Sequence, residues 1–263
     1  FAYSTKVKKF LKSDNVFNKF NTMGKYDSIL DNVLAKKFNV NKNQIVFFRT
    51  EYDALKKIVE MFVSKYNEVL TTMPTFPLLD LVSVENKSSI NAVPLNNTQD
   101  KVLDINYNNF NYTTKTKIVY LSSPNNISGQ CIRETDQWNL FLSKLPDNII
   151  LVIDQRYIDF VNDTKELDYK IGPILDPFKV LKKHKNTIIL RSFNNFYSVE
   201  NLELCYIITN KSIAELIKNT QLINPIDKFV ENLALTVIDD KYYNNTKEQI
   251  ANEREQYFKK LDK

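Results

Sequence analysis

Three polar segments, each directly after a short apolar run, hold the side chains that could do chemistry in this sequence. They are Leu121–Gln130, Val152–Phe160 and Arg191–Ser198. Their carboxylates, amides and hydroxyls can bind a ligand through charge and hydrogen bonds. If the apolar runs are neighbouring parallel strands, the segments lie together at the carboxyl edge of a sheet, where α/β proteins bind their ligands.

Taken singly, the candidate residues have ordinary structural explanations. Asp154 at the end of an apolar run is typical of a turn or helix cap, and Asn126 is typical of a turn. Tyr157 and Phe76 can simply pack in a core. Only a pattern that joins these residues would indicate a site.

The composition excludes several classes of protein. The 263 residues are 43% hydrophobic and 25% charged, as in an ordinary globular protein with a packed core. The longest apolar runs, Ile149–Ile153 and Leu204–Ile208, are far shorter than the roughly 20 residues that span a bilayer. The net charge of +5 comes mainly from lysines spread along the chain, which indicates a solvated surface. Walker, HExxH, GxSxG and nucleic-acid motifs are absent.

Cysteine and glycine are both scarce. The two cysteines, Cys131 and Cys205, have no CxxC or metal-like spacing, which argues against a disulfide scaffold and a metal site. A reducing, intracellular compartment fits best, with cytoplasm and organelle matrix not distinguished. Because the chain has only three glycines, phosphate-binding loops of the usual glycine-rich kind are not expected.

Seven short apolar runs predict the strands of the fold. Several are apolar at successive positions, which is typical of strands buried on both faces of a mainly parallel sheet. The predicted strands are Gln44–Phe48, Glu68–Met73, Ile90–Leu95, Lys117–Ser122, Ile149–Asp154, Thr187–Ser192 and Leu204–Thr209.

Segments with helical spacing separate these runs and predict the covering helices. Strand and helix alternate, so we expect an α/β domain of three α/β/α layers around a mainly parallel sheet. The long, charged segment Asn245–Leu261 is expected to be a connecting helix. The other predicted helices are Ser28–Phe38, Tyr52–Tyr66, Leu78–Val84, Thr135–Leu145, Asp176–Lys183, Ser212–Gln221 and Asp227–Ile238.

The three polar segments together resemble motifs of the class I/II aminotransferases, pyridoxal phosphate (PLP) proteins of fold type I, and most closely the histidinol-phosphate aminotransferase branch. That branch has SPNNPTG, D-E-A-Y-I-F and R-T-x-S-K-x-F-x-L-x-G-L-R-x-G where this chain has the three segments. Pro74-Thr75-Phe76 is similar to its PTY/PTF motif, and Asn43–Phe62 to its strand and phosphate-cup helix.

The resemblance covers nearly the whole large domain of that family and implies a domain organisation. It implies an N-terminal arm at residues 1–25 and a PLP-transferase-like large domain at residues 26–240. Residues 241–263 would form a helix that leads toward a small C-terminal domain, which is missing or truncated here.

The resemblance also assigns roles to four residues. Asp154 matches the acid that pairs with the pyridinium nitrogen of the coenzyme and keeps the ring protonated as an electron sink. Asn126 and Tyr157 match the residues that hydrogen-bond the 3-oxygen of the ring, and Phe76 matches the aromatic residue stacked on its face. These four residues together fit a flat aromatic ligand.

The chain departs from the family where the chemistry is most demanding. Asn195 stands at the position of the Schiff-base lysine, and an amide cannot form that bond or shuttle the proton afterwards. No lysine occurs between Lys185 and Lys211. Glu203 replaces a phosphate-binding arginine, which turns attraction into repulsion.

The phosphate cup is altered as well. Thr50, followed by Glu51 and Tyr52, stands in place of the glycine of the cup. Ser192 and Asn194 remain as neutral donors. We therefore expect Glu51, Tyr52, Ser192 and Asn194, together with the four residues assigned above, to be a vestigial coenzyme site without a catalytic residue.

These departures predict a non-catalytic aminotransferase-like protein that acts as a structural or interaction subunit, with no bound coenzyme. One alternative is a divergent aminotransferase that holds PLP or pyridoxamine phosphate (PMP) noncovalently, and another is a ligand-sensing protein. The resemblance implies a protein partner, as a homodimer, a heterodimer with an active paralogue or a larger assembly. Nucleic acid, membrane and metal are not expected partners.

Overall fold

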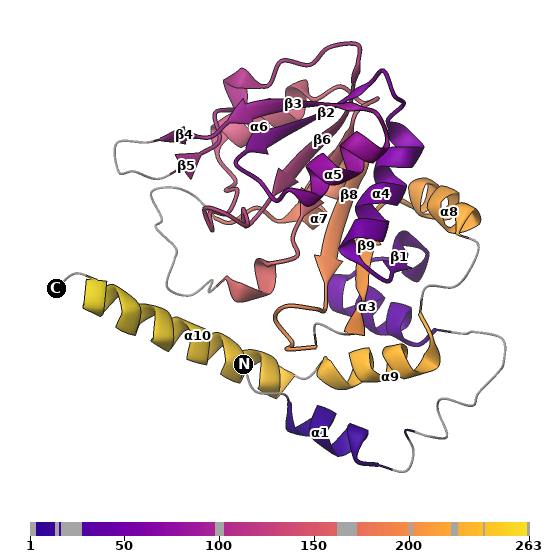
Figure 1. The fold of residues 1–263 in the computed structure, drawn as a ribbon, viewed down its shortest axis with the longest axis vertical. Helices are drawn as coiled ribbons and strands as arrows, with labels where there is room; N and C mark the ends of the chain where they lie inside the picture. The colour runs from indigo at the N-terminus through magenta and orange to yellow at the C-terminus, as the bar shows by residue number, and fades with distance from the viewer. Residues whose placement is uncertain are drawn as a thin grey trace.

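A seven-stranded sheet organises the chain (Figure 1). The computed structural model describes residues 4–13, 16, 28–97, 103–161, 173–199, 202–221, 226–238 and 240–261. The strand order is β1-β9-β8-β7-β6-β2-β3, and only β9 runs antiparallel to its neighbours. The strands are β1 (Ile45–Phe48), β2 (Glu68–Met73), β3 (Ser89–Pro94), β6 (Thr116–Ser122), β7 (Ile150–Asp154), β8 (Thr187–Ser192) and β9 (Cys205–Ile208).

Helices connect most of the strands. Thr50, Thr135, Asp176 and Asn210 accept hydrogen bonds from backbone N–H groups and so fix where α4, α6, α7 and α8 begin. None of the helices in the described part of the chain is long and apolar enough to cross a bilayer. The helices are α1 (Thr5–Leu11), α3 (Leu30–Phe38), α4 (Glu51–Phe62), α5 (Leu78–Glu85), α6 (Asp136–Lys144), α7 (Pro177–Lys183), α8 (Lys211–Thr220), α9 (Lys228–Val237) and α10 (Asp240–Leu261).

Both faces of the sheet are covered, which gives three layers (Figure 1). On one face, strand residues such as Ile118 and Val152 pack against α4, α5 and α8. On the other face, the β6 and β7 side chains pack against α6 and α7, whereas those of β1, β8 and β9 pack against α3 and α9. The predicted α/β/α class with a mainly parallel sheet is therefore confirmed.

The predicted strands all form, each within one residue of its predicted ends. The sequence did not predict α1, nor a small separate sheet of β4 (Asn96–Asn97) and β5 (Leu103–Asp104). Short 3-10 turns at Lys42–Gln44, Tyr107–Asn109 and Ile158–Phe160 were not predicted either. The C-terminal helix begins at Asp240 rather than at Asn245. Most of the predicted N-terminal arm lies outside the described residues, and the predicted domain boundaries stay a prediction.

The carboxyl ends of the parallel strands meet at one edge of the sheet. Ser122 at the end of β6 lies opposite Asp154 at the end of β7, and Ser192 ends the neighbouring β8. Glu51 begins α4 shortly after β1 reaches the same edge. This arrangement brings the polar segments of the sequence together, as expected for an α/β fold.

A buried carboxylate also fixes the start of α3. Glu231 of α9 is 1% exposed, and its Oε1 accepts hydrogen bonds from the Ile29 and Leu30 backbone N–H groups and the Ser28 hydroxyl at 2.6, 3.1 and 2.9 Å. Burial alone would raise the pKa of Glu231, but these hydrogen bonds and Lys228 outweigh it and lower the pKa. Glu231 thus ties α9 to α3.

Glu231→Gln should lower the free energy of unfolding by about 1–3 kcal/mol at neutral pH, because an amide replaces a buried, charge-assisted acceptor. Since the pKa of Glu231 is lower in the folded chain than its ordinary 4.5, its contribution is present above pH 4.5 and is lost as the pH falls through the folded value. In urea unfolding, the gap between wild type and variant should therefore narrow in acid.

Glu215→Gln, on the exposed Lys211–Glu215 pair of α8, is the matched control. It should leave stability unchanged at both pH values. A Glu231→Gln gap that stays constant far below pH 4.5 would contradict the assigned role.

Candidate functional site

Asp154 forms a buried ion pair with Arg156, two residues further along the chain. The two side chains are 1% and 5% exposed. The Arg156 Nε lies 2.9 Å from both carboxylate oxygens, and its Nη2 lies 2.7 Å from Oδ2. The Arg156 backbone N–H donates to Oδ1 at 3.1 Å, and the Tyr120 hydroxyl donates to Oδ2. These contacts occupy the acceptor capacity of the Asp154 carboxylate.

Arg156 stays charged in this position. Burial alone would lower the pKa of Arg156, but the adjacent Asp154 carboxylate outweighs that effect, and the pKa is raised well above its usual range. The Glu51 carboxylate raises the pKa of Arg156 in the same direction. The pKa of Tyr120 is raised by burial and by the Asp154 charge, which keeps its hydroxyl a donor.

The guanidinium of Arg156 lies over the ring of Phe76. Its Cζ is 5.3 Å from the ring centroid, within the range of a cation–π contact. Phe76 follows β2, whereas Arg156 follows β7, so the contact joins two loops of the carboxyl edge. The aromatic face that the resemblance assigns to a coenzyme ring therefore carries a side chain of the chain itself.

Glu51 occupies the other half of the site. Its Oε1 accepts hydrogen bonds from Ser192 Oγ at 2.6 Å and from Asn194 Nδ2 at 3.0 Å. Asn194 is itself held in place, because its Oδ1 accepts from the Leu204 backbone N–H at 3.1 Å and its own N–H donates to Ser192 Oγ at 3.1 Å. The two neutral donors predicted for a phosphate thus bind a carboxylate at the N-terminus of α4, where the helix dipole also favours negative charge.

The predicted cup residue Tyr52 lies apart from this cluster, as do Thr50 and Glu203, which stand in place of a family glycine and arginine. The Tyr52 hydroxyl donates to Glu85 of α5 and accepts from Lys56, so it belongs to a surface network between α4 and α5. Thr50 is the N-cap of α4 and accepts from the Asp53 backbone N–H at 3.0 Å. Glu203 is exposed and has a φ of 47°. Only Glu51 of the predicted cup side chains therefore meets the Ser192 and Asn194 donors.

The remaining predicted residues are half-buried near the same edge. Asn195 lies in the turn after β8, where its carbonyl accepts from the Ser198 backbone N–H at 3.4 Å. The Tyr157 ring centroid is 6.3 Å from that of Phe160. Asn126 Oδ1 and Thr75 Oγ1 are buried without a hydrogen-bond partner among the residues described. These two oxygens could serve a ligand that approaches the loops after β2 and β6.

Arg156 was not among the residues that the sequence predicted for the site. The resembled D-E-A-Y motif has alanine at this position, and the replacement of a methyl group by a guanidinium was the signal that could have found it. A long cation beside a strand-end carboxylate can pair with that carboxylate, whereas alanine leaves the carboxylate open. The arginine therefore determines what the Asp154 carboxylate binds in this structure.

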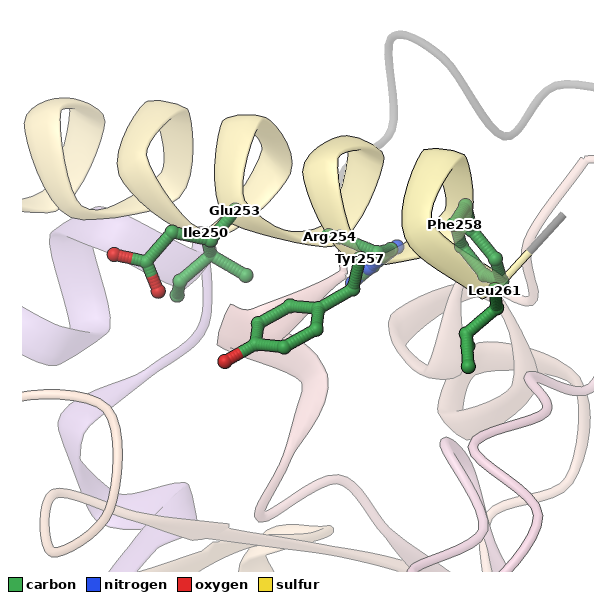
Figure 2. A pocket seen from close by; sticks show the side chains of 6 residues that line it. All are labelled: Ile250, Glu253, Arg254, Tyr257, Phe258 and Leu261. Carbon is green, nitrogen blue, oxygen red and sulfur yellow. The ribbon is translucent and has the colours of Figure 1, made fainter. Parts of the chain in front are cut away.

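Two hollows lie elsewhere on the molecule. One, of about 300 Å³, runs along α10, and Figure 2 shows its six lining side chains on the last turns of that helix. The second, of about 270 Å³, lies beside α6, and half of its lining residues are aromatic, among them Tyr107, Phe110 and Phe141. Neither hollow includes a residue that the sequence predicted for the site.

Comparison with known proteins identifies the family. The model of the aminotransferase class I and II family matches residues 4–263, so the chain belongs to that family. A curated relative, histidinol-phosphate aminotransferase 2 of Haemophilus influenzae, is 27% identical over 229 residues, which are 87% of this chain and 59% of the relative. The chain thus spans less than two thirds of the length of that relative.

Solved structures confirm the fold. The histidinol-phosphate aminotransferase from Clostridium acetobutylicum matches with a TM-score of 0.81 and 18% identity, over 99% of this chain and 74% of that protein. The PLP-bound C-S lyase from Staphylococcus hominis matches with a TM-score of 0.82 and 14% identity, over 100% of this chain and 69% of the lyase. Since the names cover different reactions, this likeness defines the architecture and not the chemistry.

The described residues do not fit PLP in the arrangement that the structure holds. A pyridinium nitrogen would need an acceptor position on Asp154 that Arg156 and Tyr120 occupy. A phosphate would meet the Glu51 carboxylate on the Ser192 and Asn194 donors. Side chains of this chain therefore occupy both the Asp154 acceptors and the Ser192 and Asn194 donors.

A double-mutant cycle should measure the Asp154–Arg156 pair. Asp154→Asn or Arg156→Met alone should each cost about 3–5 kcal/mol of unfolding free energy, because either leaves a buried charge unpaired. The double variant should cost clearly less than the sum, because it leaves neither charge buried. Urea unfolding followed by circular dichroism gives all three values.

Glu85→Gln removes an exposed partner of Lys56 and is the control for loss of a surface ion pair. It should have little effect on unfolding. If the Asp154 and Arg156 effects are additive within error, the two side chains do not interact as described.

Proposed function

We propose that this chain is part of an aminotransferase-family protein that forms no lysine-linked coenzyme and serves as a structural or interaction subunit. The observation that carries the proposal is the Asp154–Arg156 ion pair, because it takes the acid that a pyridinium ring would need. Asn195 supports it, since an amide in place of an amine has no nucleophilic nitrogen.

The charge arrangement adds support. Arg156 puts a fixed positive charge where a protonated ring would lie, and two like charges at that place would repel each other. Glu51 puts a negative charge on the donors that a phosphate would use. Both halves of a coenzyme would therefore meet a charge of their own sign.

The relatives by themselves favour a second candidate, an enzyme. It would be a divergent aminotransferase related to the histidinol-phosphate branch, holding PLP or PMP without a covalent bond. The family match over residues 4–263 supports it. So do the buried, unpartnered Asn126 Oδ1 and Thr75 Oγ1 at the same edge, within the described residues. In this candidate Arg156 would have to leave Asp154 before the ring could bind.

The first candidate, a structural or interaction subunit, requires a protein partner. The resembled family is made mostly of dimers that complete each other's sites, so a homodimer, a heterodimer with an active paralogue or a larger assembly is the form we propose for this chain. A structural or interaction subunit needs the folded sheet and its surface, but it does not need the catalytic residues.

Titration with PMP separates the two candidates. Isothermal calorimetry should detect no binding to the wild type, because Arg156 and Glu51 oppose the ring and the phosphate. Neither PLP nor PMP should give the wild type a visible absorbance band or transaminase activity.

Asn126→Ala is the matched variant, since it removes a half-buried side chain of the same edge without touching the ion pair. It should behave as the wild type does. Tight PMP binding by the wild type that Asn126→Ala weakens, together with transaminase activity, would reject the non-catalytic proposal and establish the enzyme.

A further inference from the structure

The charges that this chain places at the carboxyl edge follow the order of charges in the coenzyme. A negative group, the Glu51 carboxylate, lies on Ser192 and Asn194. A positive, flat group, the Arg156 guanidinium, lies on Asp154 and against the face of Phe76. PLP would present a phosphate and a protonated flat ring to the same two sets of partners.

Each of the two groups is held by several contacts. Arg156 makes three side-chain hydrogen-bond contacts to Asp154 and is 5% exposed. Glu51 Oε1 accepts hydrogen bonds from Ser192 at the end of β8 and from Asn194 in the turn that follows. The groups come from different elements, α4 and the β7 loop, so the fold and not a single local turn brings them together.

We propose that Glu51 and Arg156 act as an internal ligand that closes the coenzyme site, with Glu51 in the place of the phosphate and Arg156 in the place of the ring. This inference rests on the proposed function and gives its physical mechanism. In this arrangement Arg156 pairs with Asp154, and Glu51 pairs with Ser192 and Asn194. These contacts stabilise the edge of the sheet and exclude phosphorylated ligands.

If Glu51 and Arg156 close the site, removing these two side chains should open it again. Glu51→Ala frees the Ser192 and Asn194 donors and removes a negative charge from beside them. Arg156→Ala restores the alanine of the resembled D-E-A-Y motif and frees Asp154 and Phe76. The first change should suffice for inorganic phosphate, whereas PMP should need both.

The experiment measures equilibrium binding of inorganic phosphate and of PMP by calorimetry at low ionic strength, where charge effects are least screened. Four proteins are compared: wild type, Glu51→Ala, the Glu51→Ala/Arg156→Ala double variant, and Glu215→Ala as a control that removes one surface negative charge from α8. Circular dichroism and urea unfolding establish that each is folded.

We expect Glu51→Ala to bind phosphate about 100-fold more tightly than the wild type, because one like charge next to the anion is gone. The double variant should bind PMP more tightly than it binds phosphate, since the ring then adds its own contacts. Glu215→Ala should match the wild type.

The failures of the two proposals are distinguishable. If the wild type binds PMP and transaminates, the non-catalytic function is wrong, and the inference that rests on it fails with it. If the wild type binds nothing and folded Glu51→Ala also gains no phosphate affinity, the internal-ligand inference alone is wrong. Should the double variant not fold, the phosphate measurement on Glu51→Ala still decides the inference.

Discussion

The buried ion pair of Asp154 and Arg156 is the constraint on which the carboxyl edge depends. Two charges that are almost fully withdrawn from water are tolerated only when they satisfy each other, and these two do so through three side-chain contacts. Tyr120 and Phe76 complete the surroundings of the pair from β6 and from the loop after β2. The Asp154 carboxylate, at the end of β7, is therefore bound by side chains of the same chain.

The fold could be predicted from the sequence because most strands of the sheet, though not β3, are buried on both faces. Runs such as Ile149–Asp154 are apolar at nearly every position, and that pattern together with the alternating helices fixes a three-layer α/β domain. The antiparallel direction of β9 was not predicted, because a short apolar run gives no information on strand direction. The same holds for the two-residue strands β4 and β5, which are too short to show a period.

The candidate site could be predicted only in part. The positions of Asp154, Ser192 and Asn194 follow from the strand ends and from the resemblance. What these side chains bind does not, because it depends on rotamers that the sequence leaves open: Glu51 turns toward the β8 loop, whereas the adjacent Tyr52 turns toward α5. The direction of the Arg156 side chain could not be predicted either, because a cation two residues after an acid can equally point to solvent.

Family membership and chemistry are separate properties in this chain. The class I and II match accounts for the sheet and its helices, but it does not by itself define what the carboxyl edge binds. The structure shows the architecture of the family together with two sets of contacts, Asp154–Arg156 and Glu51 with Ser192 and Asn194, that the chain makes with itself.

The most direct measurement is the side-chain NMR signal of Arg156, assigned by comparison with Arg156→Lys. In the wild type the Nε–H proton should exchange slowly with water, because it is buried on Asp154. Its chemical shift and exchange rate should stay unchanged when PMP is added. A fast-exchanging Arg156 signal, or one that moves as PMP is titrated, would contradict a site closed by the chain itself.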